Sequence, residues 1–87
     1  MSIINSENDD LKKIEGIGPS IAKTLNQANI FTYQQLANCT EEILRSILNS
    51  YGTKYKFHNP SSWPQQAELA ANEKWEELNL LQKKLNS

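Results

Sequence analysis

Two glycines and a proline, Gly16-Ile17-Gly18-Pro19, make the stretch of this 87-residue sequence best suited to bind an anion. Glycine takes a positive φ without strain and lets the backbone approach another surface closely. Pro19 suits the first residue of a helix, where no backbone N–H is needed. The free N–H groups and positive dipole end of that helix, with the glycine backbone, are predicted to form a shallow anion nest, here called the hairpin nest (residues 16–21).

No group of side chains in the sequence suits catalysis. The paired acids Asp9-Asp10, Glu41-Glu42 and Glu76-Glu77 all fall at expected helix starts, where capping and the helix dipole explain them. A nuclease needs carboxylates clustered around Mg²⁺, and no such cluster is visible. His58 has no ligand partner at a suitable spacing, and the single Cys39 excludes an internal disulfide. We therefore expect a chain that is not an enzyme and has no catalytic residues.

Charge is distributed unevenly along the chain, whose formal net charge is −1. Residues 11–58 hold six Lys or Arg against three Asp or Glu, a local charge of +3. Residues 1–10 carry three acids and no base, and residues 59–87 sum to −1. The middle of the chain is therefore the part that favours an anionic partner. With no long apolar run and no signal-peptide pattern, we expect a cytoplasmic protein that does not enter a membrane.

The elements that position the nest are expected to be short helices, about six in an all-α fold. Asp9 or Asp10 caps the first helix, which buries Leu11 and Ile14 and is broken by the glycines. The second runs from Pro19 to about residue 28 and ends at a left-handed Asn29. A third helix is expected after a capping box formed by Thr32 and Gln35, with Tyr33 and Leu36 inward. A fourth is expected to begin at Thr40, with the inward residues Ile43, Leu44, Ile47 and Leu48.

The C-terminal third is expected to add two helices. Ser62-Trp63-Pro64-Gln65 is predicted to form a capping box for a helix that ends near residue 71. Asn72 is predicted to cap the last helix. Its single apolar stripe comprises Trp75, Leu78, Leu81 and Leu85. Trp63 and Trp75 are interpreted as packing anchors. Tyr55 and Phe57, in the connector before these helices, either cover the core or stack on single-stranded bases.

Residues 10–36, DLKKIEGIGPSIAKTLNQANIFTYQQL, closely resemble the helix-hairpin-helix motif. The match is to hairpins like those of DNA polymerase beta and of bacterial repair and recombination proteins. Residues 10–85 are also similar to small bacterial helix-hairpin-helix domains, stand-alone or fused, that are labelled flap-endonuclease-like. Residues 1–8 are polar and lack periodicity, so we expect a disordered tail there, and the resemblance implies one SAM-domain-like domain (9–87). Within it lie tandem hairpins (9–52, the second degenerate), a connector (53–61) and C-terminal helices (62–87).

The resemblance implies sequence-independent binding to the backbone of duplex or branched DNA, or of structured RNA. The N–H groups of Gly16, Gly18 and Ile21 would then face phosphate oxygens. The full set of residues expected at the nucleic acid is Lys13, Gly16, Ile17, Gly18, Ser20, Ile21, Lys23, Lys54 and Lys56. The resemblance also suggests one cofactor, a monovalent cation (K⁺ or Na⁺), held by the backbone carbonyls of Lys12, Ile14 and Ile17.

The sequence leaves a second function open, a protein-interaction or scaffold domain with the same fold and no DNA binding. The acidic net charge and the tryptophan-bearing C-terminal half favour it. This alternative predicts a protein partner or a homodimer through residues 63–85. Glu15, immediately before the glycines, departs from the DNA-binding pattern because its carboxylate would oppose a phosphate.

Overall fold

The computed structural model describes residues 8–51 and 58–86, and every regular element within these two ranges is helical. The 3₁₀ helices are η2 (Leu11–Lys13) and η4 (Pro60–Ser62). The α-helices are α1 (Pro19–Gln27), α2 (Tyr33–Ala37), α3 (Glu41–Ser50), α4 (Trp63–Ala71) and α5 (Trp75–Leu85). The predicted all-α fold class is confirmed. Tyr55 and Phe57 lie outside the described residues, as does nearly all of the predicted tail, so neither prediction is tested.

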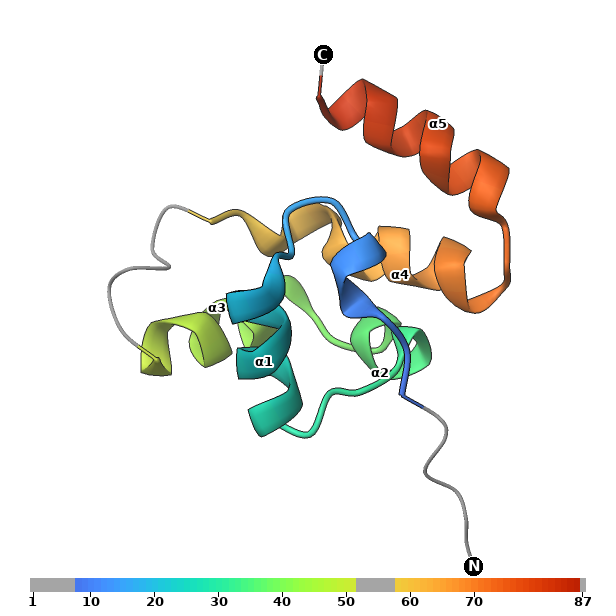
Figure 1. The fold of residues 1–87 in the computed structure, drawn as a ribbon. Helices are drawn as coiled ribbons and strands as arrows, with labels where there is room; N and C mark the ends of the chain where they lie inside the picture. The colour runs from blue at the N-terminus through green and yellow to red at the C-terminus, as the bar shows by residue number, and fades with distance from the viewer. Residues whose placement is uncertain (1–7, 52–57, 87) are drawn as a thin grey trace, which may run out of the picture.

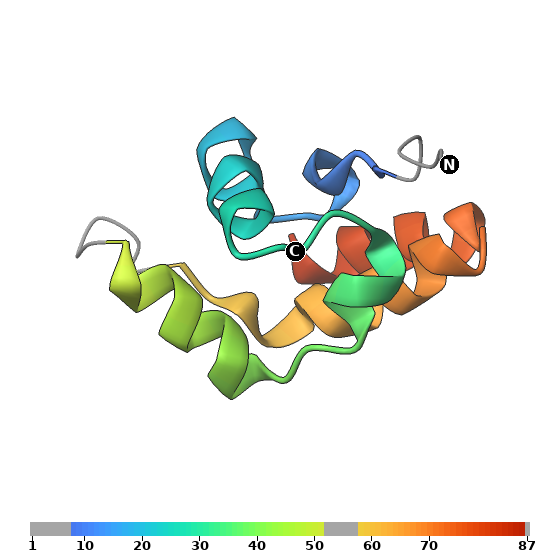
Figure 2. The same ribbon diagram turned by 90° about the horizontal axis from the view of Figure 1, so that it is seen from below.

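A single apolar core joins these helices. Helix α4 packs against α2 and α5, and α1 packs against α3. Figure 1 and Figure 2 show α3 at one side of the molecule and α5 at the other, with the remaining helices between them. The buried apolar side chains are Leu11, Ile14, Ile17, Ile21, Leu25, Ile30, Tyr33, Leu36, Leu44, Leu48, Trp63, Ala67, Ala70 and Leu78. A chain this short has a marginal core, so each buried group matters.

Several local signals in the N-terminal half have the predicted outcome. Asp10 caps η2 by accepting from the Lys12 N–H at 3.1 Å. Thr32 and Gln35 form the complete capping box of α2, and Thr40 caps α3. The turn after α1 has Asn29 at φ +69°, the left-handed conformation that ends a helix. These contacts are all local, which is why the sequence predicts them.

Three predictions about the later helices are wrong. Ile43 is 50% exposed, because α3 turns only Leu44, Leu48 and part of Ile47 toward the core. Ser62 makes no capping bond, since it is the last residue of η4 and its hydroxyl accepts from the Gln66 side chain instead. Asn72 ends α4 rather than beginning α5.

The predicted apolar stripe of α5 is only partly buried. Leu78 is 3% exposed, but Trp75 and Leu85 are each 43% exposed. The helix lies at the edge of the molecule, where α4 is the described element that packs most extensively along it. An edge position leaves apolar side chains of α5 in contact with solvent.

Tyr33 links the N-terminal segment to the core. Its backbone N–H donates to the Asp9 carboxylate at 2.8 Å, and its hydroxyl donates to the Asp10 carbonyl at 2.8 Å. Burial of the ring, followed by the negative charges of Asp9 and Asp10, raises the pKa of Tyr33 to about 12. The folded state therefore favours the neutral phenol.

This shift predicts a loss of stability in alkaline solution. The contribution of neutral Tyr33 is complete below pH 10, its ordinary pKa, and is lost as the pH rises toward about 12. Over that window we expect the free energy of unfolding of the wild-type chain to fall more steeply than that of Tyr33→Phe. Urea unfolding of the wild type and of Tyr33→Phe, below and above pH 10, measures the two free energies of unfolding. Parallel pH curves for the two chains would contradict a buried, hydrogen-bonded phenol.

Candidate nucleic-acid interface

The hairpin nest lies in the loop between η2 and α1 (Figure 1). The Ile17 N–H donates to the Ile14 carbonyl at 3.0 Å, and the Ile17 side chain is 4% exposed, so it anchors the turn. Gly18 caps α1, whose first backbone bond runs from the Ala22 N–H to the Gly18 carbonyl at 2.9 Å. Within the described residues, no acceptor pairs with the N–H groups of Gly18 or Ile21. Both donors are therefore available to an external ligand.

Gly16 is required by the fold itself. Its φ is +101°, a conformation that side chains of L-residues rarely adopt. A Cβ at this position would lie 2.8 Å from Nε1 of Trp63, whose side chain is 1% exposed. The indole ring of α4 therefore packs directly on the backbone of the turn. Both the conformation and the contact explain the glycine without any ligand.

At position 18, by contrast, the fold itself does not require a glycine. Its φ of −99° and ψ of −172° are extended values that any residue adopts. A Cβ there would meet nothing within 4 Å. Serine, threonine, asparagine or aspartate would cap the helix at least as well. The missing side chain instead keeps the surface in front of the helix N-terminus open to a close external approach.

A buried amide holds the turn in place. Gln66 of α4 is 0% exposed and bridges both polar groups of the Glu15 peptide. Its Oε1 accepts from the Glu15 N–H at 2.7 Å, and its Nε2 donates to the Glu15 carbonyl at 3.2 Å. The same amide also bonds to Ser62 Oγ and to Gln82 Nε2, so both its donors and both its acceptor positions are used. Gln82 of α5 donates in turn to the Lys13 carbonyl at 2.8 Å.

The four lysines of the predicted interface fall into two groups. Lys13 and Lys23 are exposed on η2 and α1, on either side of the nest in the sequence. Lys54 and Lys56 lie outside the described residues. Arg45, the single arginine of the sequence, was not predicted to bind, and the structure ties it to other protein groups.

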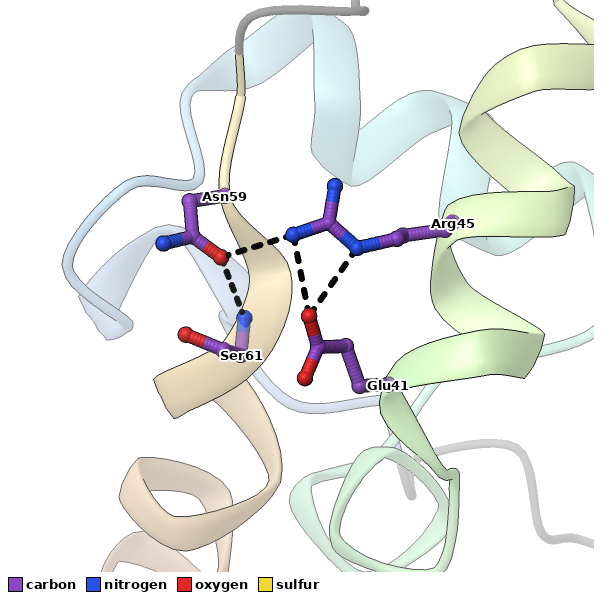
Figure 3. Close-up of polar contacts among 4 residues, drawn as sticks. All are labelled: Glu41, Arg45, Asn59 and Ser61. Carbon is purple, nitrogen blue, oxygen red and sulfur yellow. Dashed lines mark hydrogen bonds and ion pairs between the residues drawn. The ribbon is translucent and has the colours of Figure 1, made fainter.

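Arg45 connects α3 to η4. Its guanidinium contacts Glu41 Oε2 at 2.9 Å and donates to Asn59 Oδ1 at 3.2 Å. Asn59 Oδ1 also accepts from the Ser61 N–H at 3.1 Å (Figure 3). Because both charged side chains are exposed, this pair contributes little to stability, about 1 kcal/mol at most. Arg45 therefore provides a cation with known partners, Glu41 of α3 and Asn59 beside η4.

Ser20 and Ile21, also predicted at the interface, begin α1 beside Pro19. Ser20 is exposed, and its carbonyl accepts from the Thr24 hydroxyl at 3.1 Å. The Ile21 side chain is buried, so only its backbone N–H is available to a ligand. Of the carbonyls predicted to hold a cation, that of Ile14 already accepts the Ile17 N–H. Cation binding by Lys12, Ile14 and Ile17 stays a prediction.

The described part of the chain contains no cluster of His, Cys, Asp and Glu that would hold a metal ion. Burial raises the pKa of the Cys39 thiol, which makes it a poor nucleophile. No helix among the described residues is long and apolar enough to cross a membrane. The arrangement offers donors and positive charge for an anion, with no group placed for bond making.

Sequence reasoning missed Gln66, Gln82 and the exposure of Trp75. Glutamine on a helix is ordinarily a solvated residue, and the partner of Gln66 lies 51 positions away. The sequence predicted that Ser62 caps a helix, whereas its hydroxyl accepts from Gln66. Pairing between a buried amide and a distant turn leaves no local pattern to find.

Comparison with known proteins adds three findings. A family model described as the RS2/RL21/YNQ2 HHH domain matches residues 11–71. Large ribosomal subunit protein bL21 of Hyphomonas neptunium is 37% identical over 62 residues, covering 71% of this chain and 30% of that protein. The same-named protein of Mesorhizobium japonicum is 49% identical over 41 residues, covering 47% of this chain and 18% of that protein. No solved structure matches significantly.

These findings support the predicted helix-hairpin-helix type of domain. They do not support the finer resemblance to DNA polymerase beta or to flap-endonuclease-like domains, since the similar proteins are ribosomal. Neither relative is named as an enzyme, in agreement with the expected non-catalytic chain. The match spans less than a third of the length of either relative.

Proposed function

The chain belongs to the RS2/RL21/YNQ2 HHH domain family, and we propose that it is a non-enzymatic module that binds the backbone of structured RNA through the hairpin nest. The observation that carries this proposal is Gly18. It is a glycine that neither its backbone angles nor its neighbours require, directly in front of unpaired N–H groups. A phosphate oxygen needs that space and those donors.

RNA is favoured over DNA by the names of the similar proteins. The two relatives are named as proteins of the large ribosomal subunit, and the family model matches a region that includes the hairpin. We therefore propose ribosomal RNA as the partner and the cytoplasm as the location of this chain. Backbone amides that meet phosphates read no bases, so the same nest would accept DNA. DNA is therefore the competitor in the test.

A protein partner through residues 63–85 is the second candidate. Leu80 and Leu85 on α5 are 58% and 43% exposed. Exposed apolar side chains of this kind are surface that a protein partner can cover. A partner or a homodimer covering α5 would leave the nest free. Sedimentation of the purified chain separates the two, because a monomer that binds RNA needs no such interface.

The test of the main proposal is a fluorescence titration of labelled RNA hairpins and matched DNA duplexes at about 50 mM and about 200 mM salt. We expect Gly18→Val to bind at least about tenfold more weakly than the wild type, because its side chain occupies the phosphate position. Valine suits the extended backbone of residue 18, so the variant is expected to stay folded.

Two charge variants provide the matched comparison. Lys23→Ala should weaken binding to all sequences and lower the slope of log affinity against log salt by about one. Arg45→Ala removes the same charge from α3 and should leave that slope unchanged. Equal affinity of Gly18→Val and the wild type, with both chains folded, would exclude the nest as the binding site.

A further inference from the structure

The two tryptophans of the chain have opposite environments. Trp63 is 1% exposed, whereas Trp75 is 43% exposed although it is the largest apolar side chain of α5. The Trp75 ring meets Tyr33 edge to face, with centroids 5.8 Å apart and planes at 76°. Since Tyr33 is itself buried and hydrogen-bonded, this contact fixes the plane of the indole. Trp75 is therefore a rigid aromatic surface that stays open to solvent.

A groove of about 460 Å³ lies beside this ring, between η2 and α5. Its lining residues are Lys13, Trp75, Glu76, Leu78, Asn79 and Gln82, and we call it the Trp75 groove. Leu78 provides a buried apolar floor, and four of the six residues are polar or charged. The volume suits a small planar molecule, and the mixed lining suits one that carries its own donors and acceptors.

The groove and the hairpin nest share one segment of backbone. Gln82 lines the groove and donates to the carbonyl of Lys13, three residues before Gly16. Gln82 also donates to Gln66, which holds the Glu15 peptide at the start of the turn. Two side-chain amides therefore link the groove to the segment that leads into the nest.

The lining residues provide the contacts that a nucleobase uses. An aromatic face stacks on a base, and a lysine beside it contacts the phosphate. Both N–H groups of the Gln82 amide are already engaged, which leaves its Oε1 as an acceptor. Asn79 offers a further donor and acceptor, and Glu76 offers a carboxylate for a base amino group.

We propose that the Trp75 groove holds one unpaired nucleobase, stacked on Trp75, with its phosphate at Lys13. The proposal rests on the proposed RNA-binding function and narrows it to RNA that has an unpaired nucleotide beside a helix. Helix α5 lies beyond residues 11–71, the part that the family model matches.

The test uses RNA hairpins with and without a single-nucleotide bulge, together with a short single-stranded RNA. We expect the single strand to quench the fluorescence of the exposed Trp75, leaving the emission of buried Trp63. Trp75→Leu should abolish this quenching and weaken binding of the bulged hairpin about tenfold. Its affinity for the fully paired hairpin should stay within about twofold of wild type, because the nest is intact.

Two further variants separate stacking from a general effect of mutating α5. Trp75→Phe keeps an aromatic face and should recover most of the bulge preference. Leu80→Ala, on the solvent side of the same helix, should bind both RNAs as the wild type does. If Trp75→Leu does not fold, Asn79→Ala replaces it, because the exposed Asn79 is expected to affect bulge binding alone.

The outcomes distinguish this inference from the proposed function. Binding of paired RNA with no bulge preference and no quenching overturns the groove and leaves the nest. Quenching by the single strand without any binding of paired RNA supports the groove and overturns the nest. A bulge preference that survives Trp75→Leu unchanged also overturns the groove.

Discussion

The Gly16→Ala variant is expected to lose about 2–4 kcal/mol of folding free energy. The added Cβ forces a non-glycine residue to φ +101° and places a carbon 2.8 Å from the Trp63 ring nitrogen. The backbone conformation alone costs about 1–3 kcal/mol. Relief of the contact requires movement of a ring that is 1% exposed, so the rest of the core must adjust with it.

Gly18→Ala is the matched control, with the same substitution two residues away. Its backbone angles are ordinary and its Cβ position is empty, so we expect a change within about 1 kcal/mol. Urea unfolding of the two variants and the wild type measures the difference. Equal stabilities would mean that Trp63 does not pack on the turn as described.

The second large effect is expected for Gln66→Leu, with a loss of about 2–4 kcal/mol. Leucine fills most of the volume of the glutamine but offers no hydrogen bond. The N–H and carbonyl of Glu15 then lose their side-chain partner while partly buried, and Gln82 loses one of its acceptors. Unpaired buried polar groups are costly, and here two belong to the turn itself.

Gln65→Leu, one position earlier on α4, provides the comparison because Gln65 is exposed. We expect its free energy of unfolding to stay within about 0.5 kcal/mol of wild type. Amide hydrogen exchange adds a local measurement, since the Glu15 N–H should exchange faster in Gln66→Leu and unchanged in Gln65→Leu. Protection of the Glu15 amide in both variants would show that Gln66 does not hold the turn.

The success of the sequence predictions follows the range of the interactions behind them. Thr32 and Asn29 act within a few residues, and both have the predicted role. Ile17 points inward because the glycines on either side leave it as the tip of a tight turn. The motif likewise identified the type of domain that the family comparison supports.

The errors fall where a distant neighbour decides the outcome. Apolar periodicity predicted burial of Ile43 and Trp75, but burial also needs a partner element on every side, and these side chains remain 50% and 43% exposed. The two glycines look equivalent in the sequence. The structure separates them by the positive φ of Gly16 and by the position of Trp63, which a helix contributes 47 residues later.

The bonds between Gln66 and Glu15 also bear on the order in which the molecule folds. They join residues 51 positions apart, so the turn reaches its final shape only after α4 has docked. An excised peptide of residues 10–36 contains the whole motif but lacks this support. Transplanting the anion-binding turn into another scaffold therefore requires a substitute for Gln66, and the smallest self-sufficient unit extends through α4.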